Sequence, residues 1–145
     1  MFVVDTNILL YAANTNSGEH KICRRFILEC RKQVSPWYLT WGIVYEFLRV
    51  ATHPRVFRKP LHIMDAWKFI QSLQASPSLS MLMETDLHSE VASEVFNAIP
   101  LLLGNLVFDG RTAVLMKEHG IKRIYTRDTD FHRFPFLEVI DPLQV

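Results

Sequence analysis

Short apolar runs alternate along the chain with longer segments in which apolar positions recur every three or four residues. The short runs predict buried strands at residues 2–4, 80–83 and 121–126, with a weaker fourth at 137–140. The longer segments predict helices at residues 7–13, 19–32, 40–50, 63–73, 86–98 and 106–119. Gly120 is a typical C-cap for the last helix, and Pro36, Pro54 and Pro60 interrupt the pattern between helices.

This alternation of strands and helices predicts the fold class. Short apolar strands joined through helices are typical of βαβ units, whose strands run parallel and are covered on both faces. We therefore predict an α/β fold with a mostly parallel central sheet. No repeat, low-complexity tract or Gly/Ser-rich linker divides the sequence, so residues 1–145 are expected to form a single domain.

Composition excludes several classes of protein. The 145 residues are 49% hydrophobic and 21% charged, which excludes a disordered chain. Sixteen Lys and Arg residues against fifteen Asp and Glu leave a net charge of +1, so a nucleic-acid partner would have to be held by a local basic patch. The first residues lack a signal-peptide pattern, and no apolar stretch reaches about 18 residues. We expect a cytoplasmic protein with no membrane segment.

The cysteines and histidines do not predict a disulfide or a zinc site. Cys23 and Cys30 stand seven positions apart on one predicted helix, about 10 Å, which is beyond disulfide reach. The sequence has no C-x-x-C motif, and its six histidines are scattered.

Carboxylates follow two of the predicted strands. Asp5 comes directly after residues 2–4, and Asp128 and Asp130 follow the strand that ends at Thr126. Ligands of parallel sheets bind beyond the carboxyl ends of the strands, so these acids can meet at one edge. Each also has a simpler interpretation, because Asp5 could serve only as a helix cap and Asp128 only as a turn residue.

Two further acids lie on predicted helices that are otherwise largely apolar. Glu46 shares residues 41–51 with only one other charge, Arg49, which predicts a buried carboxylate in need of a partner or a metal. The alternative is an exposed Glu46–Arg49 pair at i,i+3. Asp109 lies in a similar setting, and its alternative is an N-cap role in a helix that begins late, at Gly110.

Together these acids predict a carboxylate cluster. Two carboxylates about 5 Å apart repel by roughly 3 kcal/mol at an effective dielectric of about 20, so they must share protons or hold a cation. Oxygen ligands without nearby His or Cys select Mg²⁺ or Mn²⁺. A divalent ion that keeps coordination positions open for water is a common catalyst of phosphodiester hydrolysis.

The motifs that carry these acids resemble PIN-domain ribonucleases, most of all VapC-type toxins of bacterial toxin–antitoxin pairs. The resemblance rests on four segments, in order: Val4-Asp5-Thr6-Asn7, Val44-Tyr45-Glu46-Phe47, Gly104-Asn105-Leu106-Val107-Phe108-Asp109 and Thr126-Arg127-Asp128-Thr129-Asp130-Phe131. It implies a three-layer α/β/α PIN-like fold, a homodimer, and an antitoxin whose flexible tail blocks the acidic pocket.

The resemblance also implies roles for individual residues. The catalytic, metal-binding acids would be Asp5, Glu46, Asp109 and Asp128, with Asp130 as the alternative to Asp128. Thr6, Asn7 and Thr126 would hold these carboxylates or the attacking water. One departure is the sequence Gly110-Arg111-Thr112 where the family's helix is usually alanine-rich. It leaves open where this helix begins and whether Arg111 reaches the pocket.

Basic residues suggest where a substrate would lie. Residues 49–59 hold four basic residues and no acid, so Arg55 and Arg58 are candidate phosphate contacts and Phe57 a candidate for base stacking. A solvated loop or a dimer contact is the alternative. A second basic group follows residue 121, and its member Arg127 lies beside the proposed pocket; Arg111 is a further candidate. Aromatic residues concentrate at 37–41 and 67–69, where they serve the core or a homodimer interface.

The function predicted from these features is metal-dependent endoribonuclease activity with Mg²⁺ or Mn²⁺. One alternative is a non-catalytic PIN-like module that binds RNA or protein, although all four acidic positions are filled. A phosphatase of the haloacid-dehalogenase type would need Asp-x-Asp, and Asp5-Thr6-Asn7 lacks the second carboxylate. A phosphate-accepting receiver domain would need its acids on loops and a Lys after a late strand.

Overall fold

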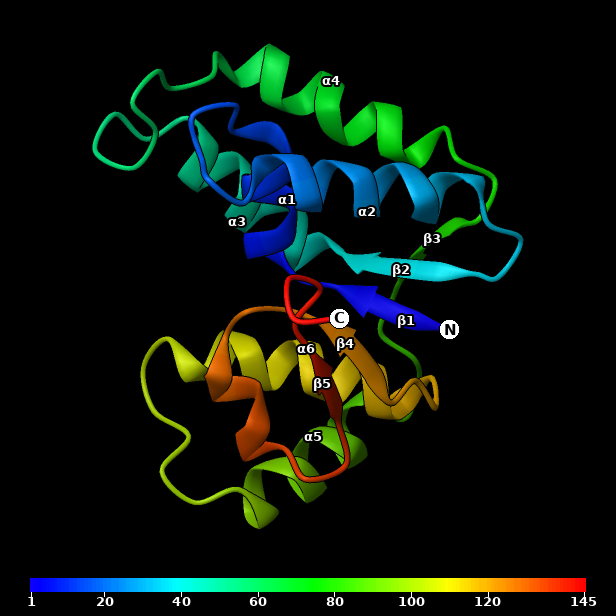
Figure 1. Cartoon of the computed structure of the whole chain (residues 1–145). Coiled ribbons are helices and arrows are strands. Elements are labelled where there is room, and N and C mark those ends of the chain that lie inside the picture. Colours follow the sequence, from blue (N-terminus) through cyan, green and yellow to red (C-terminus); the bar gives the residue numbers. More distant parts are fainter.

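Five short strands form one parallel sheet in the order β3-β2-β1-β4-β5 (Figure 1). The computed structural model describes all residues, 1–145. The strands are β1 (Phe2–Val4), β2 (Trp37–Thr40), β3 (Leu79–Leu82), β4 (Arg123–Tyr125) and β5 (Glu138–Ile140). The chain builds outward from β1 to β3 in one direction and then places β4 and β5 on the other side of β1. This change of direction between β1 and β4 is where parallel sheets place their ligand sites.

Helices cover both faces of the sheet, which gives the predicted three-layer α/β/α architecture (Figure 1). One face carries α1 (Thr6–Ala13), α2 (His20–Lys32), α3 (Trp41–Ala51) and α4 (Ile63–Gln74). The other face carries α5 (His88–Ala98) and α6 (Leu106–Glu118). A 3₁₀ helix, η1 (Thr129–Arg133), connects β4 to β5.

The core lies between these layers and fixes the central strand. Val3 and Val4 of β1 are completely buried, as are Trp37 and Leu39 of β2. The two cysteines are buried and free, in agreement with their spacing. No helix is both long enough and apolar enough to cross a membrane.

The sequence prediction missed one strand, β2, and the 3₁₀ helix η1. Residues 37–40 form a buried parallel strand beside β1, and Thr40 then caps α3 directly, its hydroxyl accepting from the backbone N–H of Ile43 at 3.1 Å. Because no turn separates this strand from the helix, the pattern contains no boundary between them. The predicted helix and strand limits elsewhere differ by at most two residues, and β4 is three residues shorter than the predicted 121–126.

Candidate active site

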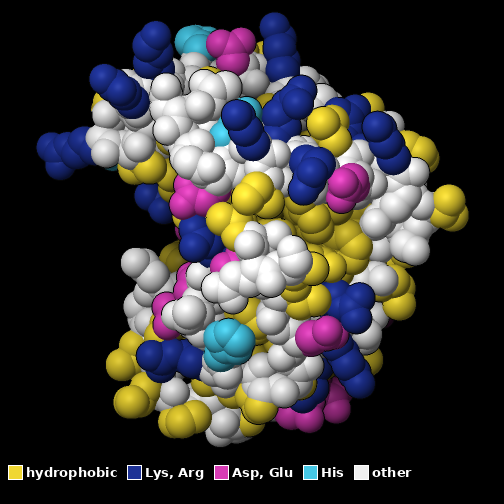
Figure 2. Space-filling model, in the orientation of Figure 1, with side chains coloured by type: hydrophobic (Ala, Val, Ile, Leu, Met, Phe, Trp, Pro, Cys, Tyr) yellow, Lys and Arg dark blue, Asp and Glu magenta, His cyan; other side chains and the backbone are white.

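The acidic side chains meet at the carboxyl edge of the sheet, beside the ends of β1 and β4. Asp5 follows β1 directly and its backbone N–H donates to the carbonyl of Tyr125 at 3.0 Å, which ties the two strand ends together. Its side chain caps α1, with Oδ1 accepting from the backbone N–H of Thr6 at 2.8 Å. Asp5 is therefore both a helix cap and a member of the acidic site. In Figure 2 a hollow on the left edge of the molecule has acidic side chains on its walls.

A hydroxyl and an amide hold the other oxygen of Asp5. Oδ2 accepts from the Thr126 hydroxyl at 2.7 Å and from Nδ2 of Asn7 at 2.9 Å. The Thr126 oxygen itself accepts from Asn7 Nδ2 and from the backbone N–H of Asp128, both at 2.9 Å. Thr126 is 1% exposed, and its hydroxyl makes three hydrogen bonds, its full ordinary capacity. Thr126 and Asn7 thus hold the carboxylate of Asp5, and Thr126 also links Asp5 to the segment that carries Asp128.

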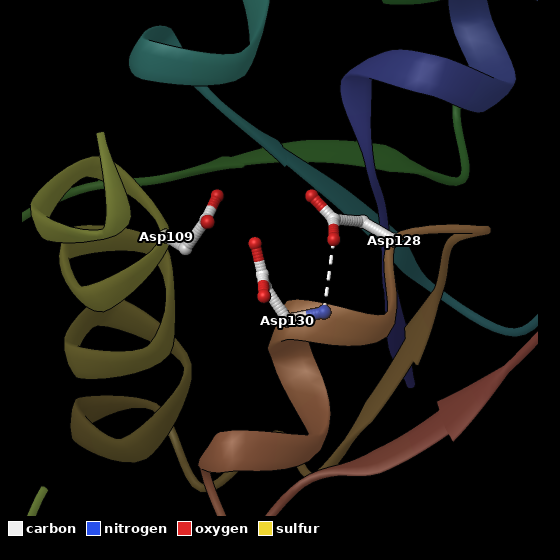
Figure 3. A group of neighbouring side chains, drawn as sticks. All are labelled: Asp109, Asp128 and Asp130. Carbon is white, nitrogen blue, oxygen red and sulfur yellow. Dashed lines mark hydrogen bonds between the residues drawn. The ribbon is translucent and has the colours of Figure 1, made fainter.

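Three carboxylates face one another next to this network (Figure 3). Asp109, on the first turn of α6, points toward Asp128 and Asp130 at the start of η1, and oxygens of all three lie within 4.8 Å of one another. Asp128 caps η1 by accepting from the backbone N–H of Asp130 at 2.9 Å. The sequence did not decide whether Asp128 or Asp130 is the fourth acid of the site. In the structure both residues lie beside Asp109.

Glu46 reaches the same site from α3, but it is not buried. Half of its side-chain surface is exposed, and Oε1 lies 3.8 Å from Arg49 Nη2, which is the i,i+3 pair named as the alternative. The predicted burial was wrong, because α3 is apolar on more than its core face: the neighbouring Tyr45 is 66% exposed. Glu46 also accepts from the Thr6 hydroxyl at 3.1 Å, which holds the carboxylate toward the site.

The packing at the start of α6 explains why Gly110 stands where the family's helix is usually alanine-rich. The helix begins at Leu106 after Asn105, so Asp109 is not its N-cap. A Cβ atom on Gly110 would lie 2.9 Å from Cδ2 of Leu102, so the glycine lets the preceding loop pack against the helix. The helix is also less enclosed than its composition suggested, since Phe108 is 68% exposed.

Burial and mutual repulsion raise the pKa of two acids. Burial raises the pKa of Asp5 to about 6; hydrogen bonds from Thr126 and the backbone of Thr6 oppose this shift, and the charges of Glu46 and Asp128 add to it. Burial also raises the pKa of Asp109 to about 7, assisted by the charges of the other acids. Carboxyl groups whose pKa values are raised this far by burial and by neighbouring acids are typical of functional sites.

The donor set suits a hard divalent cation. The groups that converge are carboxylates with no His or Cys among them, the ligands that Mg²⁺ and Mn²⁺ prefer. Asp109 forms no hydrogen bond through its carboxylate within the chain, so its oxygens are free to coordinate an ion. The residues present therefore fit a Mg²⁺ or Mn²⁺ site.

The metal-free protein is expected to lose stability as the pH rises from about 4 to about 7. Asp5 and Asp109 have folded-state pKa values above the ordinary aspartate value of 3.8, so over this interval the folded state binds more protons than the unfolded state. The shift at Asp5 alone corresponds to about 3 kcal/mol. Urea denaturation in EDTA at about pH 5 and about pH 7.5 measures the loss. Stability that rises over this range in EDTA would contradict the assignment, and added Mg²⁺ should reduce the loss.

The basic residues proposed to contact substrate have different surroundings. Arg127 is held by Glu19, with Nη1 at 3.0 Å, and by Asp141, with Nε at 3.3 Å. Its guanidinium is thereby occupied, while its backbone N–H donates to Asn7 Oδ1 at 3.2 Å. Arg111 pairs with Glu84 at 3.0 Å rather than with the three aspartates. Both arginines therefore have partners that the sequence did not predict.

The loop after α3 keeps its two predicted arginines free. Arg55 and Arg58 are exposed and take part in no ion pair within the chain. Phe57 between them is 4% exposed and packs into the core, so it is not an exposed ring as the sequence predicted. The sequence of the loop could not show which residue is buried and which are free to bind substrate. Phe57 anchors the loop in the core, while its neighbours face solvent.

Sequence reasoning also missed Glu19 and Asp141, which position Arg127. No local signal could have found them, because Glu19 lies 108 positions before Arg127. Tyr11 was missed as well, although it lies four residues after Asn7 on the predicted helix and therefore on the same face. The Arg127 guanidinium lies over the Tyr11 ring at 5.9 Å from its centroid.

Comparison with known proteins identifies the family. The family model of the PIN domain matches residues 2–137. Ribonuclease VapC24 of Mycobacterium tuberculosis is 32% identical over 146 aligned residues, covering 99% of this chain and 97% of that protein. The fold is similar to Mycobacterium tuberculosis VapC20, described as a Sarcin-Ricin loop cleaving toxin (TM-score 0.68, 18% identity, 97% and 100% coverage). It is also similar to VapBC2 from Rickettsia felis bound to a promoter DNA fragment (TM-score 0.69, 15% identity, 96% of each chain). The chain therefore belongs to the PIN domain family and resembles its VapC members over almost its whole length.

Proposed function

We propose that this protein is a metal-dependent endoribonuclease and the toxin of a VapBC-type toxin–antitoxin pair. The observation that carries the proposal is the meeting of Asp109, Asp128 and Asp130, with oxygens within 4.8 Å, beside the hydrogen-bonded carboxylate of Asp5. The ribonuclease names of its relatives support RNA as the substrate. The VapBC pair among its fold neighbours supports an antitoxin as partner. We further propose a homodimer.

The carboxylates of the site would bind the cation, and neighbouring groups would orient them. Asp5, Asp109 and Asp128 would hold the cation, with Asp130 and Glu46 completing the set of oxygen ligands. Mg²⁺ or Mn²⁺ bound there would supply Lewis-acid stabilisation of charge on the phosphate and would lower the pKa of water. Thr126, Asn7 and the backbone N–H of Thr6 keep Asp5 in one orientation before substrate arrives.

The reaction would be a direct displacement by water. The water oxygen forms a bond to phosphorus in line with the leaving oxygen, the bond from phosphorus to the 3′ oxygen breaks, and that oxygen takes up a proton from solvent. The proton that the water gives up would pass to Glu46, whose half-exposed carboxylate accepts a hydrogen bond from the Thr6 hydroxyl. The products carry 5′-phosphate and 3′-hydroxyl ends, because the 2′-hydroxyl of the RNA takes no part.

A cleavage assay tests the proposed function. A mixed pool of small structured RNAs is incubated in single-turnover conditions with Mg²⁺, with Mn²⁺ or with excess EDTA. We expect cutting with either metal, none with EDTA, and 5′-phosphate ends on the products. Asp5→Asn should abolish cutting while circular dichroism stays that of a folded protein.

Three results would contradict the proposed function or its mechanism. Undiminished cleavage by Asp5→Asn would remove Asp5 from the site, and cyclic 2′,3′-phosphate ends would show that the RNA supplies its own nucleophile. The absence of cutting by folded wild type under all conditions would favour the non-catalytic binding module instead.

A further inference from the structure

A second feature of this edge of the molecule is a cavity between α1 and the loop of residues 52–62. Its volume is about 250 Å³. It is lined by Asn7, Leu10, Tyr11, Asn14, Val56 and Phe57. Asn7, Leu10 and Tyr11 stand at i, i+3 and i+4 on one face of α1, and Asn14 is the C-cap residue of that helix. This face begins at Asn7, which holds Asp5, and reaches about 10 Å along the helix to Asn14.

The lining combines apolar walls with a few polar groups that have no partner in the chain. Leu10, Val56 and the buried ring of Phe57 supply the apolar surface. Asn14 uses only its Oδ1, which accepts from the backbone N–H of Asn16 at 3.1 Å. Its Nδ2 and the hydroxyl of Tyr11 take part in no hydrogen bond within the chain. Such a set of walls and free donors is typical of a site for a small planar polar group.

The rim of the cavity is basic. Arg55, Arg58 and Lys59 are exposed on the loop that forms one wall, and none of them forms an ion pair within the chain. In Figure 2 several Lys and Arg side chains stand out from the upper part of the molecule, where Figure 1 places this loop. Arg127, which lies over the Tyr11 ring, pairs with Glu19 and Asp141, so the basic side chains at this rim without an ion pair are those of the loop. The charge around the cavity therefore complements a phosphate backbone.

We propose that this cavity binds one nucleobase of the RNA, a neighbour of the phosphate that is cut. The inference rests on the proposed function and adds a recognition site to it. The base lies against Tyr11 and the apolar walls, Asn14 donates to an acceptor on its edge, and the basic loop contacts the flanking phosphates. Tyr11 is suited to this because Arg127, itself fixed by two carboxylates, lies over its ring. The site therefore gives the enzyme a preference at one nucleotide position near the cut.

Filling the cavity tests the proposal. Val56→Trp places a large side chain in the cavity from its loop wall, and Asn14→Ala removes the free donor. We expect Val56→Trp to raise KM for RNA about tenfold with little change in kcat, because the stacking of one base on a protein side chain strengthens binding by about tenfold. Both variants should weaken the base preference at one position when products of a random-sequence RNA pool are sequenced. Val34→Trp, at a valine that is 98% exposed before β2, is the matched control.

Photocrosslinking separates this proposal from the proposed function. Asp109→Asn, expected not to cleave, is irradiated with short single-stranded RNA that contains 4-thiouridine. We expect crosslinked peptides that contain Tyr11 or Phe57, lost when Val56→Trp is added and kept when Val34→Trp is added. Crosslinks that fall only elsewhere, or an unchanged KM and base preference in Val56→Trp, would overturn the nucleobase site even if cleavage occurs. Protection of the cavity by a bound antitoxin peptide, with no RNA crosslink there, would assign it to a protein partner.

Discussion

Asp109→Asn is expected to abolish RNA cleavage and, in EDTA, to make the protein more stable than wild type. The carboxylate of Asp109 makes no hydrogen bond within the chain, but it is partly buried and repelled by four other acids, so its pKa lies at about 7. The asparagine keeps the shape of the side chain and removes this repulsion. Because the group is partly open to solvent, we expect a gain of about 1 to 2 kcal/mol at about pH 7.5. Cleavage should fall by about a thousandfold or more.

The stability gain has a defined pH dependence. At about pH 4, close to the ordinary aspartate pKa of 3.8, folded wild type holds the proton on Asp109 and much of the unfolded chain holds it too, so the difference between variant and wild type should be small. Asp86→Asn is a suitable control, because Asp86 is an exposed loop acid outside the cluster. Thermal melts in EDTA at both pH values measure the effect. A variant less stable than wild type at the higher pH would show that favourable contacts, rather than repulsion, dominate at Asp109.

Thr126→Val is expected to have the largest cost in stability. The valine keeps the volume of the side chain but leaves the backbone N–H of Asp128 without a partner, and Asp5 Oδ2 and Asn7 Nδ2 keep only each other. Buried groups that lose a partner cost about 1 to 3 kcal/mol each, so we expect a loss of about 2 to 4 kcal/mol. The melting temperature should fall by roughly 10 °C. Cleavage should fall about 10- to 100-fold, as for other residues that orient metal ligands.

Two matched variants decide whether the hydroxyl is responsible. Thr126→Ser keeps the hydroxyl and should recover most of the stability and activity. Thr112→Val makes the same change at another buried threonine, whose hydroxyl has only one long contact, 3.5 Å to the carbonyl of Phe108. It should be nearly neutral. Wild-type melting and cleavage in Thr126→Val would mean that Asp5 does not depend on this network.

The position of the site could be predicted because strand ends in a parallel sheet share an edge. Asp5 and Thr126 end two apolar runs 121 positions apart, and the pairing of β1 with β4 brings them to 2.7 Å. Asp109 could be placed near them because a helix that precedes β4 must begin at the same edge. These inferences need only the order of strands and helices and the place of each acid within it.

Side-chain burial and long-range partners could not be predicted in the same way. Glu46 has apolar neighbours in sequence, yet one of them, Tyr45, faces solvent, so local composition overstated its burial. Phe57 occurs between basic residues and nevertheless packs inward. The sequence suggested that Arg127 is free to bind substrate. In the fold, the start of α2 and the C-terminal segment bring Glu19 and Asp141 into ion pairs with it. The errors at Glu46 and Phe57 concern which way a side chain faces, and the partners of Arg127 come from distant segments; both depend on packing rather than on pattern.

The most direct test of the carboxylate site is a Mn²⁺ titration of wild type and Asp109→Asn, followed by cleavage assays on the same preparations. We predict that wild type binds Mn²⁺ with release of protons at about pH 6.5, because raised carboxyl pKa values mean that protons must leave when the ion binds. Asp109→Asn should bind the ion far more weakly and should not cut RNA. Equal Mn²⁺ binding by the two proteins, or metal-independent cleavage by wild type, would contradict a metal site built on these carboxylates.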